Sequence, residues 1–172
     1  MSKGYVHIYT GNGKGKTTAA LGLALRAVGA GKRVFVAQFV KGMKYSEVDI
    51  INNRFDEIEI RQYGLDCFIF NAPTDADIEA AREGLNEVKS ILCNSSYDLV
   101  ILDEANIALY YNLFGVDELI DALRLRNDNM EVVITGRYAP EKLIEYADLV
   151  TEMKEVKHYY NNGVEARKGI EF

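Results

Sequence analysis

Tryptophan is absent from the 172 residues, and cysteine, histidine and proline occur only twice each. Cys67 and Cys93 form no CxxC pair and belong to no Cys/His cluster. This pattern is typical of unpaired thiols in a reducing compartment. The sequence therefore gives no sign of a disulfide framework or of a cysteine-based metal centre.

Positive charge and long apolar runs are also scarce. Lys and Arg number 20 against 26 Asp and Glu, the net charge is −6, and the basic residues are scattered. A nucleic-acid binder needs a basic patch for the phosphates, so this distribution argues against one. No apolar run approaches the roughly 20 residues of a membrane span, and the N-terminus lacks the order of a signal peptide. We therefore expect a cytoplasmic protein without nucleic-acid or membrane partners.

The composition and the pattern of the sequence predict one α/β domain over residues 1–172, because 48% of the residues are hydrophobic and short β-branched runs alternate with helical patterns. The predicted strands are Tyr5–Tyr9, Val34–Phe39, Glu57–Arg61, Leu99–Leu102, Val132–Thr135 and Leu149–Thr151. Alternation of this kind is typical of a mostly parallel sheet flanked by helices.

Helical periodicity fills the intervals between these strands. Three apolar stripes have the spacing of a buried helix face: Leu21, Ala24, Leu25 and Val28; Ile78, Ala81, Leu85, Val88 and Leu92; and Val116, Leu119, Ile120 and Leu123. Gly29 and Gly31 end the first helix, and Thr74 with Asp77 predicts a capping box for the second. Pro140 indicates the first turn of a fourth helix.

The stretch TGNGKGKTT, Thr10–Thr18, lies between the first predicted strand and the first predicted helix. Its glycines allow successive backbone N–H groups to turn toward one anion, and the helix N-terminus adds positive potential. Lys16 can reach phosphate oxygens, and the Thr17 hydroxyl can bind Mg²⁺. We interpret the stretch as a phosphate-binding loop; the alternative is a glycine-rich turn with a solvated lysine.

A pair of carboxylates follows another predicted strand. In YDLVILDE, the apolar residues Leu99–Leu102 lead directly to Asp103 and Glu104. Ligands of open α/β sheets bind at the carboxyl ends of strands, and a metal on a triphosphate needs hard oxygen ligands. Such a pair alone also fits a loop start or a helix cap, but its combination with the loop predicts a metal site.

One position departs from the usual phosphate loop: Thr10 holds the place of the first glycine, which comes one residue later at Gly11. The sequence resembles the ATP:corrinoid adenosyltransferase family of the P-loop type in this loop, in QFVKG (Gln38–Gly42), LDEAN (Leu102–Asn106), TGR (Thr135–Arg137) and the ending VKHYYNNGVEARKGIEF. The resemblance covers nearly the whole chain and is loosest from about Met43 to Pro73.

The resemblance implies a P-loop NTPase (RecA-like) fold and an enzyme that transfers the 5′-deoxyadenosyl group of ATP to the Co(I) of a corrinoid. Triphosphate is the leaving group. ATP would lie reversed in the loop, with the ribose 5′ carbon toward the corrinoid. Since cobalt is the nucleophile, the protein has to orient two reactants and stabilise the leaving anion. His7 and His158 accordingly form no recognisable triad with a serine or cysteine.

The resemblance also assigns roles to residues. Lys16 and Thr17 would be catalytic, and Thr17 with Asp103 or Glu104 would hold Mg²⁺, or Mn²⁺ in its place. The expected ATP-binding set is Gly11, Asn12, Gly13, Lys14, Gly15, Lys16, Thr17, Thr18 and Arg137. Corrinoid and ATP are the substrates, a flavodoxin-like protein or a flavin reductase would be a partner, and the family suggests a homodimer.

Tyr63, Phe68 and Phe70 fall where longer relatives carry aromatic residues that face the corrinoid. This segment lacks Trp, so the residue that displaces the lower cobalt ligand stays open, and the three rings are as readily core or rim residues. Arg137 either touches phosphate or is an exposed arginine at a strand end. His158 either lines the site or is structural, whereas His7, inside a strand, favours a packed or hydrogen-bonded role.

Two other classes of function remain at this stage. One is a RecA-like P-loop ATPase that acts on a partner or on nucleic acid, which the acidic composition and the C-terminal motif disfavour. The other is a protein that binds ATP or corrinoid without turnover, which the presence of Lys16, Thr17 and Asp103 disfavours. The products formed from ATP distinguish the three hypotheses.

Overall fold

Six parallel strands form one sheet in the order β3-β2-β4-β5-β1-β6. The computed structural model describes residues 3–43, 45–65, 69, 72–94 and 96–172. The strands are β1 (Val6–Thr10), β2 (Val34–Phe39), β3 (Ile58–Tyr63), β4 (Leu99–Asp103), β5 (Glu131–Thr135) and β6 (Leu149–Glu152). All six carboxyl ends therefore lie along one edge of the sheet.

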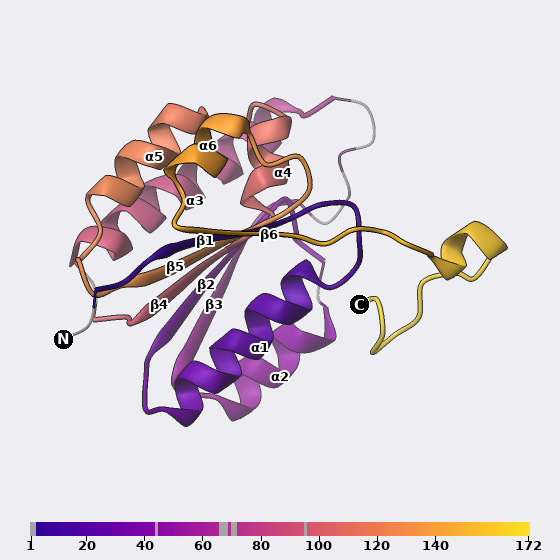
Figure 1. The fold of residues 1–172 in the computed structure, drawn as a ribbon, viewed down its shortest axis with the longest axis horizontal. Helices are drawn as coiled ribbons and strands as arrows, with labels where there is room; N and C mark the ends of the chain where they lie inside the picture. The colour runs from indigo at the N-terminus through magenta and orange to yellow at the C-terminus, as the bar shows by residue number, and fades with distance from the viewer. Residues whose placement is uncertain (1–2, 44, 66–68, 70–71, 95) are drawn as a thin grey trace.

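Helices cover both faces of this sheet (Figure 1). One face carries α1 (Lys16–Gly29) and α2 (Ser46–Arg54), and the other carries α3 (Asp75–Asn94), α4 (Ala105–Tyr110), α5 (Val116–Arg124) and α6 (Glu141–Tyr146). After β6 the chain continues beyond the carboxyl edge, where Tyr159–Asn162 forms a 3₁₀ turn (Figure 1). Within the described residues, no helix has the length and apolar character needed to cross a membrane.

The central strands β2 and β4 are mostly apolar because both of their faces are covered, and their polar residues Gln38 and Asp103 lie near the carboxyl ends. Along β2, Val34 and Val36 pack in the core beneath α1, whereas Phe35, Ala37 and Phe39 pack in the core beneath α3. This alternation follows from the two-residue period of a strand. The doubly covered sheet leaves its carboxyl edge as the place where loops from several strands meet.

The structure confirms all six predicted strands, and their observed ends differ from the predicted ones by at most two residues. It also confirms the capping box, because Thr74 and Asp77 exchange backbone and side-chain hydrogen bonds. The predicted buried stripe of the first helix was wrong at Leu25, which is 50% exposed. Its buried face instead consists of Ala20, Ala24 and Ala27, small residues that let α1 lie close to the sheet.

Two helices were not predicted, and both are short. α2 buries only Val48 and Ile51, too few residues to show a period. α4 has six residues and begins inside the LDEAN motif, where a metal site was preferred to the alternative of a helix cap; Glu104 is the N-cap residue of α4. Pro140 lies one residue before α6, with φ −64° and ψ 142°, rather than within its first turn.

Candidate active site

The displaced glycine of the phosphate loop has a structural cause. Thr10 is still the last residue of β1, and the chain turns at Gly11, where φ is 92°. A Cβ atom on Gly11 would lie 2.5 Å from the carbonyl oxygen of Met153. Gly13 is equally confined, since its N–H donates to that same oxygen at 2.6 Å. The segment after β6 thus passes so close to the loop that glycine is required at these positions.

Lys16 lies inside the loop. Its side chain donates to the carbonyl oxygens of Gly11 and Gly13 at 2.9 and 2.8 Å, and only 7% of the residue is exposed. Burial lowers the pKa of the Lys16 ammonium, and the negative charge of Glu104 opposes this shift. The loop therefore concentrates one positive charge where its backbone N–H groups would receive an anion.

Asp103, at the end of β4, lies beside the start of α1 and is 1% exposed. One carboxylate oxygen accepts hydrogen bonds from Thr17 at 2.8 Å and from Thr135 at 2.7 Å. The other accepts from Lys41 at 2.8 Å and from Gln38 at 3.2 Å. Burial would raise the pKa of Asp103, but the Lys41 charge and these hydrogen bonds hold it below its ordinary value. Asp103 is therefore an ionised carboxylate with four donors.

Glu104, the next residue, is in the opposite situation. Its backbone is left-handed, with φ 57°, and its N–H donates to the Thr135 hydroxyl at 3.0 Å. Burial, followed by the negative charge of Asp103, raises the pKa of the Glu104 carboxyl. In the part of the chain that the structure describes, no hydrogen-bond donor contacts this carboxylate. The motif therefore presents one saturated carboxylate and one free carboxylate.

Lys41, Gln38 and Thr135 belong to this site, although the sequence gave them no role there. Gln38 and Lys41 occur in the QFVKG motif, and Val40 between them has φ 59°. Lys41 also lies over the ring of Tyr45, 5.2 Å from its centroid. Gln38 and Lys41 reach Asp103 because β2 pairs with β4, which places Gln38 opposite Asp103. The sequence offered one indication of their role, because Gln38 and Lys41 are polar residues that follow the apolar run Val34–Ala37.

A cavity of about 1010 Å³ opens in front of the loop. Of the residues predicted to bind ATP, its lining includes Asn12, Gly13, Lys14, Gly15, Lys16, Thr17, Thr18 and Arg137, and it also includes Lys41, Glu104 and His158. The structure therefore brings nearly the whole predicted set into one place, with Gly11 directly behind it. His158 lies in the lining, the position expected from its site-lining alternative.

The C-terminal segment, residues 167–172, forms one side of this cavity. Lys14 donates to the carbonyl oxygen of Ile170 at 2.6 Å and contacts the Glu171 carboxylate at 3.3 Å. Glu171 also accepts from the Tyr159 hydroxyl and from the N–H of Arg167, and these bonds lower its pKa to about 2. Lys14 thus points toward this segment, whereas Lys16 points into the loop.

Of the predicted corrinoid-facing residues, the structure describes Tyr63, which does not line this cavity. Tyr63 packs on Phe39, with 5.7 Å between the ring centroids, and its hydroxyl donates to Glu87 at 2.5 Å. It is half-buried against α3, and its role toward a corrinoid stays a prediction. Phe68 and Phe70 lie outside the described residues. The Nε2 atom of His7 lies 2.6 Å from a carboxylate oxygen of Glu131, which agrees with the hydrogen-bonded role favoured for it.

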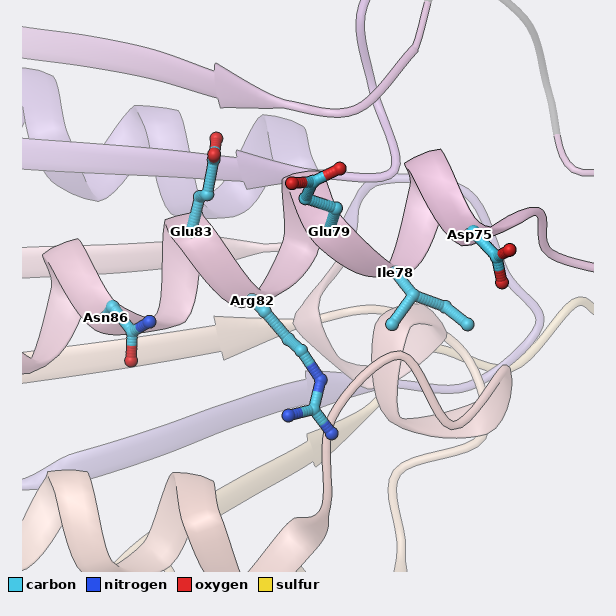
Figure 2. A pocket seen from close by; sticks show the side chains of 6 residues that line it. All are labelled: Asp75, Ile78, Glu79, Arg82, Glu83 and Asn86. Atoms are coloured by element: carbon cyan, nitrogen blue, oxygen red, sulfur yellow. The ribbon is translucent and has the colours of Figure 1, made fainter.

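A second hollow, of about 360 Å³, lies along α3 and is lined by Asp75, Ile78, Glu79, Arg82, Glu83 and Asn86. Figure 2 shows that these side chains diverge from the helix: Arg82 points away from Glu79 and Glu83. Binding sites need a few polar groups that converge on a ligand. This hollow lacks that convergence, so the cavity at the phosphate loop is the candidate site.

Known proteins resemble this chain over nearly its whole length. The protein family described as ATP:corrinoid adenosyltransferase BtuR/CobO/CobP matches residues 2–172. The corrinoid adenosyltransferase of Escherichia coli (strain K12) is 39% identical over 171 residues, which cover 99% of this chain and 86% of the relative. Corrinoid adenosyltransferase CobA of Salmonella typhimurium is 37% identical over the same shares of both chains. A corrinoid adenosyltransferase from Sinorhizobium is 38% identical and covers 99% of this chain and 81% of the relative.

Proposed function

The chain belongs to the ATP:corrinoid adenosyltransferase family, and we propose that the cavity around Lys16 and Glu104 is where it carries out that reaction. The reaction transfers the 5′-deoxyadenosyl group of ATP to the Co(I) of a corrinoid. The observation that carries the site assignment is the 2.8 Å contact between the Thr17 hydroxyl and Asp103, next to Lys16. It joins the phosphate loop to the carboxyl end of β4. We treat residues 1–172 as one catalytic domain.

In this proposal the triphosphate lies in the loop from Gly11 to Thr18, against its backbone N–H groups. Cobalt forms a bond to the 5′ carbon, the bond from that carbon to oxygen breaks, and its electron pair leaves with the triphosphate. Lys16 stabilises the negative charge that develops on this leaving group, because its ammonium is already in place before the reaction. Arg137, in the cavity lining, supplies a second positive charge.

The oxygen donors at the site fit a magnesium ion. The Thr17 hydroxyl, Asp103 and Glu104 are hard ligands of the kind that Mg²⁺ takes beside phosphates, and Mn²⁺ accepts the same donors. Four hydrogen bonds already saturate Asp103, whereas Glu104 has a free carboxylate. We therefore assign direct binding to Glu104 and Thr17, with Asp103 holding the Thr17 hydroxyl. When bound, the metal neutralises phosphate charge.

The remaining partners follow from the chemistry. Co(I) requires a reductant, so we propose a flavodoxin-like protein or a flavin reductase as the electron donor. Dependence on ATP supports a cytoplasmic location. A homodimer is supported by the edge strand β6, where Leu149 and Val150 are 42% and 41% exposed. Tyr63, Phe68 and Phe70 are proposed to face the corrinoid.

One incubation tests the proposed site and the reaction together. The protein is mixed with ATP, Mg²⁺ and chemically reduced cobalamin, and the products are identified with the wild type and with Thr17→Ala. We expect a light-sensitive adenosylated corrinoid and intact triphosphate, with a higher Mg²⁺ requirement for the variant. A RecA-like ATPase would instead release ADP and phosphate without corrinoid, and a binding protein would release neither. An unchanged Mg²⁺ requirement would contradict the metal assignment.

A further inference from the structure

Two tyrosines form an exposed stacked pair at the carboxyl edge of the sheet. Tyr110 is the last residue of α4 and Tyr138 follows β5, and their ring centroids lie 4.5 Å apart at an interplanar angle of 31°. Tyr110 is 55% and Tyr138 52% exposed. Aromatic pairs in proteins usually bury much of their surface. These rings instead present a large aromatic surface to solvent.

The backbone holds this pair in a strained position. Tyr138 has φ 61°, a left-handed conformation that is unfavourable for a bulky side chain. The loop before it is held against α4, because Asn106 donates to the carbonyl oxygen of Gly136 at 3.1 Å. A Cβ atom on Gly136 would lie 2.9 Å from Asn106 Cβ. The fold therefore maintains an exposed ring at an unfavourable backbone position, which is typical of functional sites.

The pair also connects the proposed ATP cavity with the segment assigned to the corrinoid. Arg137, beside Tyr138, and Ile107, one turn before Tyr110, both line the cavity. On the other side, Tyr111 packs edge-on against Tyr110, with centroids 5.4 Å apart, and donates to the carbonyl oxygen of Ile69 at 3.4 Å. The rings thus lie at the rim of the cavity, and Tyr111 links them to Ile69 on the other side.

We propose that Tyr110 and Tyr138 form a platform that contacts the corrinoid substrate, which rests on the proposed function of the cavity. A corrin ring is broad, carries many methyl groups and bears amide side arms at its rim. Tyrosine suits both features, since its ring packs on apolar surface and its hydroxyl hydrogen-bonds to amides. The platform would hold the macrocycle from the β5 side, and it adds residues from α4 and from the loop after β5 to that site.

The test uses two platform variants, Tyr110→Ala and Tyr138→Gly, with Tyr5→Ala as the matched control. Tyr5 is 45% exposed and lies at the opposite edge of the sheet. With chemically reduced cobalamin, each platform variant should raise the KM for corrinoid about tenfold, as loss of a packed ring contact would. The KM for ATP should stay within about twofold. Tyr5→Ala should change neither constant.

Stability separates this role from simple packing. Glycine accepts the left-handed backbone, so Tyr138→Gly should keep or raise the melting temperature while it weakens corrinoid binding. Equilibrium dialysis with ATP present gives the affinity of each variant for cob(II)alamin, and so tests the platform without turnover. Failure of the wild type to transfer the 5′-deoxyadenosyl group to cobalt would overturn the proposed reaction. The platform would be overturned if Tyr138→Gly and Tyr110→Ala bound cob(II)alamin as tightly as Tyr5→Ala does. It would also be overturned if these variants changed only the reaction rate with the electron donor or only the oligomeric state.

Discussion

The two edges of the sheet use charged residues in different ways. At the amino edge, three acidic residues accept hydrogen bonds from backbone N–H groups: Asp98 from Arg33 at 2.9 Å, Glu131 from Tyr5 at 2.9 Å and Asp148 from Val6 at 2.8 Å. Each bond fixes the start of a neighbouring segment. At the carboxyl edge, the buried Asp103 and the partly buried Glu104 lie beside Lys16 and Lys41, and Glu104 has no donor among the described residues. The first arrangement holds the fold together, whereas the second keeps charge ready for a ligand.

The backbone shows the same contrast. Among the described residues, the non-glycine residues with positive φ are Val40, Glu104, Asn112 and Tyr138. Three of them follow strands at the carboxyl edge, namely β2, β4 and β5. Such conformations cost on the order of 1–3 kcal/mol each and persist where the surrounding structure enforces them. This protein therefore concentrates unfavourable backbone conformations at the edge where we propose that substrate binds.

The largest expected effect is on activity, and it should arise from removing a positive charge at the carboxyl edge but not at the amino edge. Lys16→Ala should lower kcat/KM for ATP by about 10²-fold or more, because it removes a fixed positive charge from the leaving triphosphate. Arg33→Ala, which removes a positive charge at the amino edge, should change it less than twofold. Steady-state kinetics with chemically reduced cobalamin measures both. Comparable losses in the two variants would show that charge at the carboxyl edge has no special role.

Substitution of one aspartate at each edge, Asp103 and Asp148, shows how strongly the stability of the fold depends on charge at that edge. Asp103→Asn should destabilise the fold by about 3 kcal/mol, because it leaves the buried Lys41 without its carboxylate. Asp148→Asn weakens a single hydrogen bond to a backbone N–H and should cost about 1 kcal/mol. Urea unfolding at neutral pH measures both values. If Asp148→Asn cost as much as Asp103→Asn, the two edges would not differ in how strongly they depend on charge pairing.

A substitution at Glu104 should change stability in the opposite direction. Because the folded protein raises the pKa of Glu104, its ionised form opposes folding; stability is lost as pH rises from the ordinary pKa of Glu to the raised one, and the loss is complete above it. Glu104→Gln should therefore stabilise the protein at pH 8, by about 1 kcal/mol or about 2–4 °C in Tm. The gain should vanish near pH 4, and adenosylation should fall. Melting curves at both pH values provide the measurement, and a variant that is less stable at pH 8 would contradict the assignment.

The smallest effect concerns Phe68 and Phe70, which lie outside the described residues. If their rings face the corrinoid and exclude its lower ligand, Co(II) becomes easier to reduce. Phe68→Ala and Phe70→Ala should then slow adenosylation severalfold with a flavoprotein reductant and spare it with a strong chemical reductant. The two assays are run beside a melting curve. Equal losses with both reductants, together with a lower Tm, would identify the rings as ordinary core.

Much of the fold was accessible from the sequence because its signals are local. The apolar run from Val34 to Ala37 in β2 and the alternation of strands with helices reveal a doubly covered parallel sheet without knowledge of contacts. Leu25 was misassigned because α1 buries a stripe of alanines, and apolar size is a poor guide where helix and sheet approach closely. α4 was missed because six residues are too few for periodicity.

The site was predictable as far as sequence neighbours define it. The phosphate loop and the Asp103–Glu104 pair each carry their chemistry within a few residues. Lys41 and Thr135 were missed because they reach Asp103 only through the order of β2, β4 and β5 in the sheet, which no local pattern reveals. The different states of Asp103 and Glu104 likewise depend on those neighbours, so the sequence left open which carboxylate would bind metal.

The contact between the phosphate loop and the C-terminal segment has a consequence for biosynthesis. Lys14 bonds to Ile170, 156 positions later in the chain. At about 5–20 residues per second, the ribosome delivers Ile170 roughly 10–30 s after Lys14. Until then the nascent chain has its phosphate loop but lacks one wall of the cavity. A polypeptide interrupted after β6 would contain all six strands without the complete cavity that we propose binds ATP, so ATP binding would report that synthesis has reached this segment.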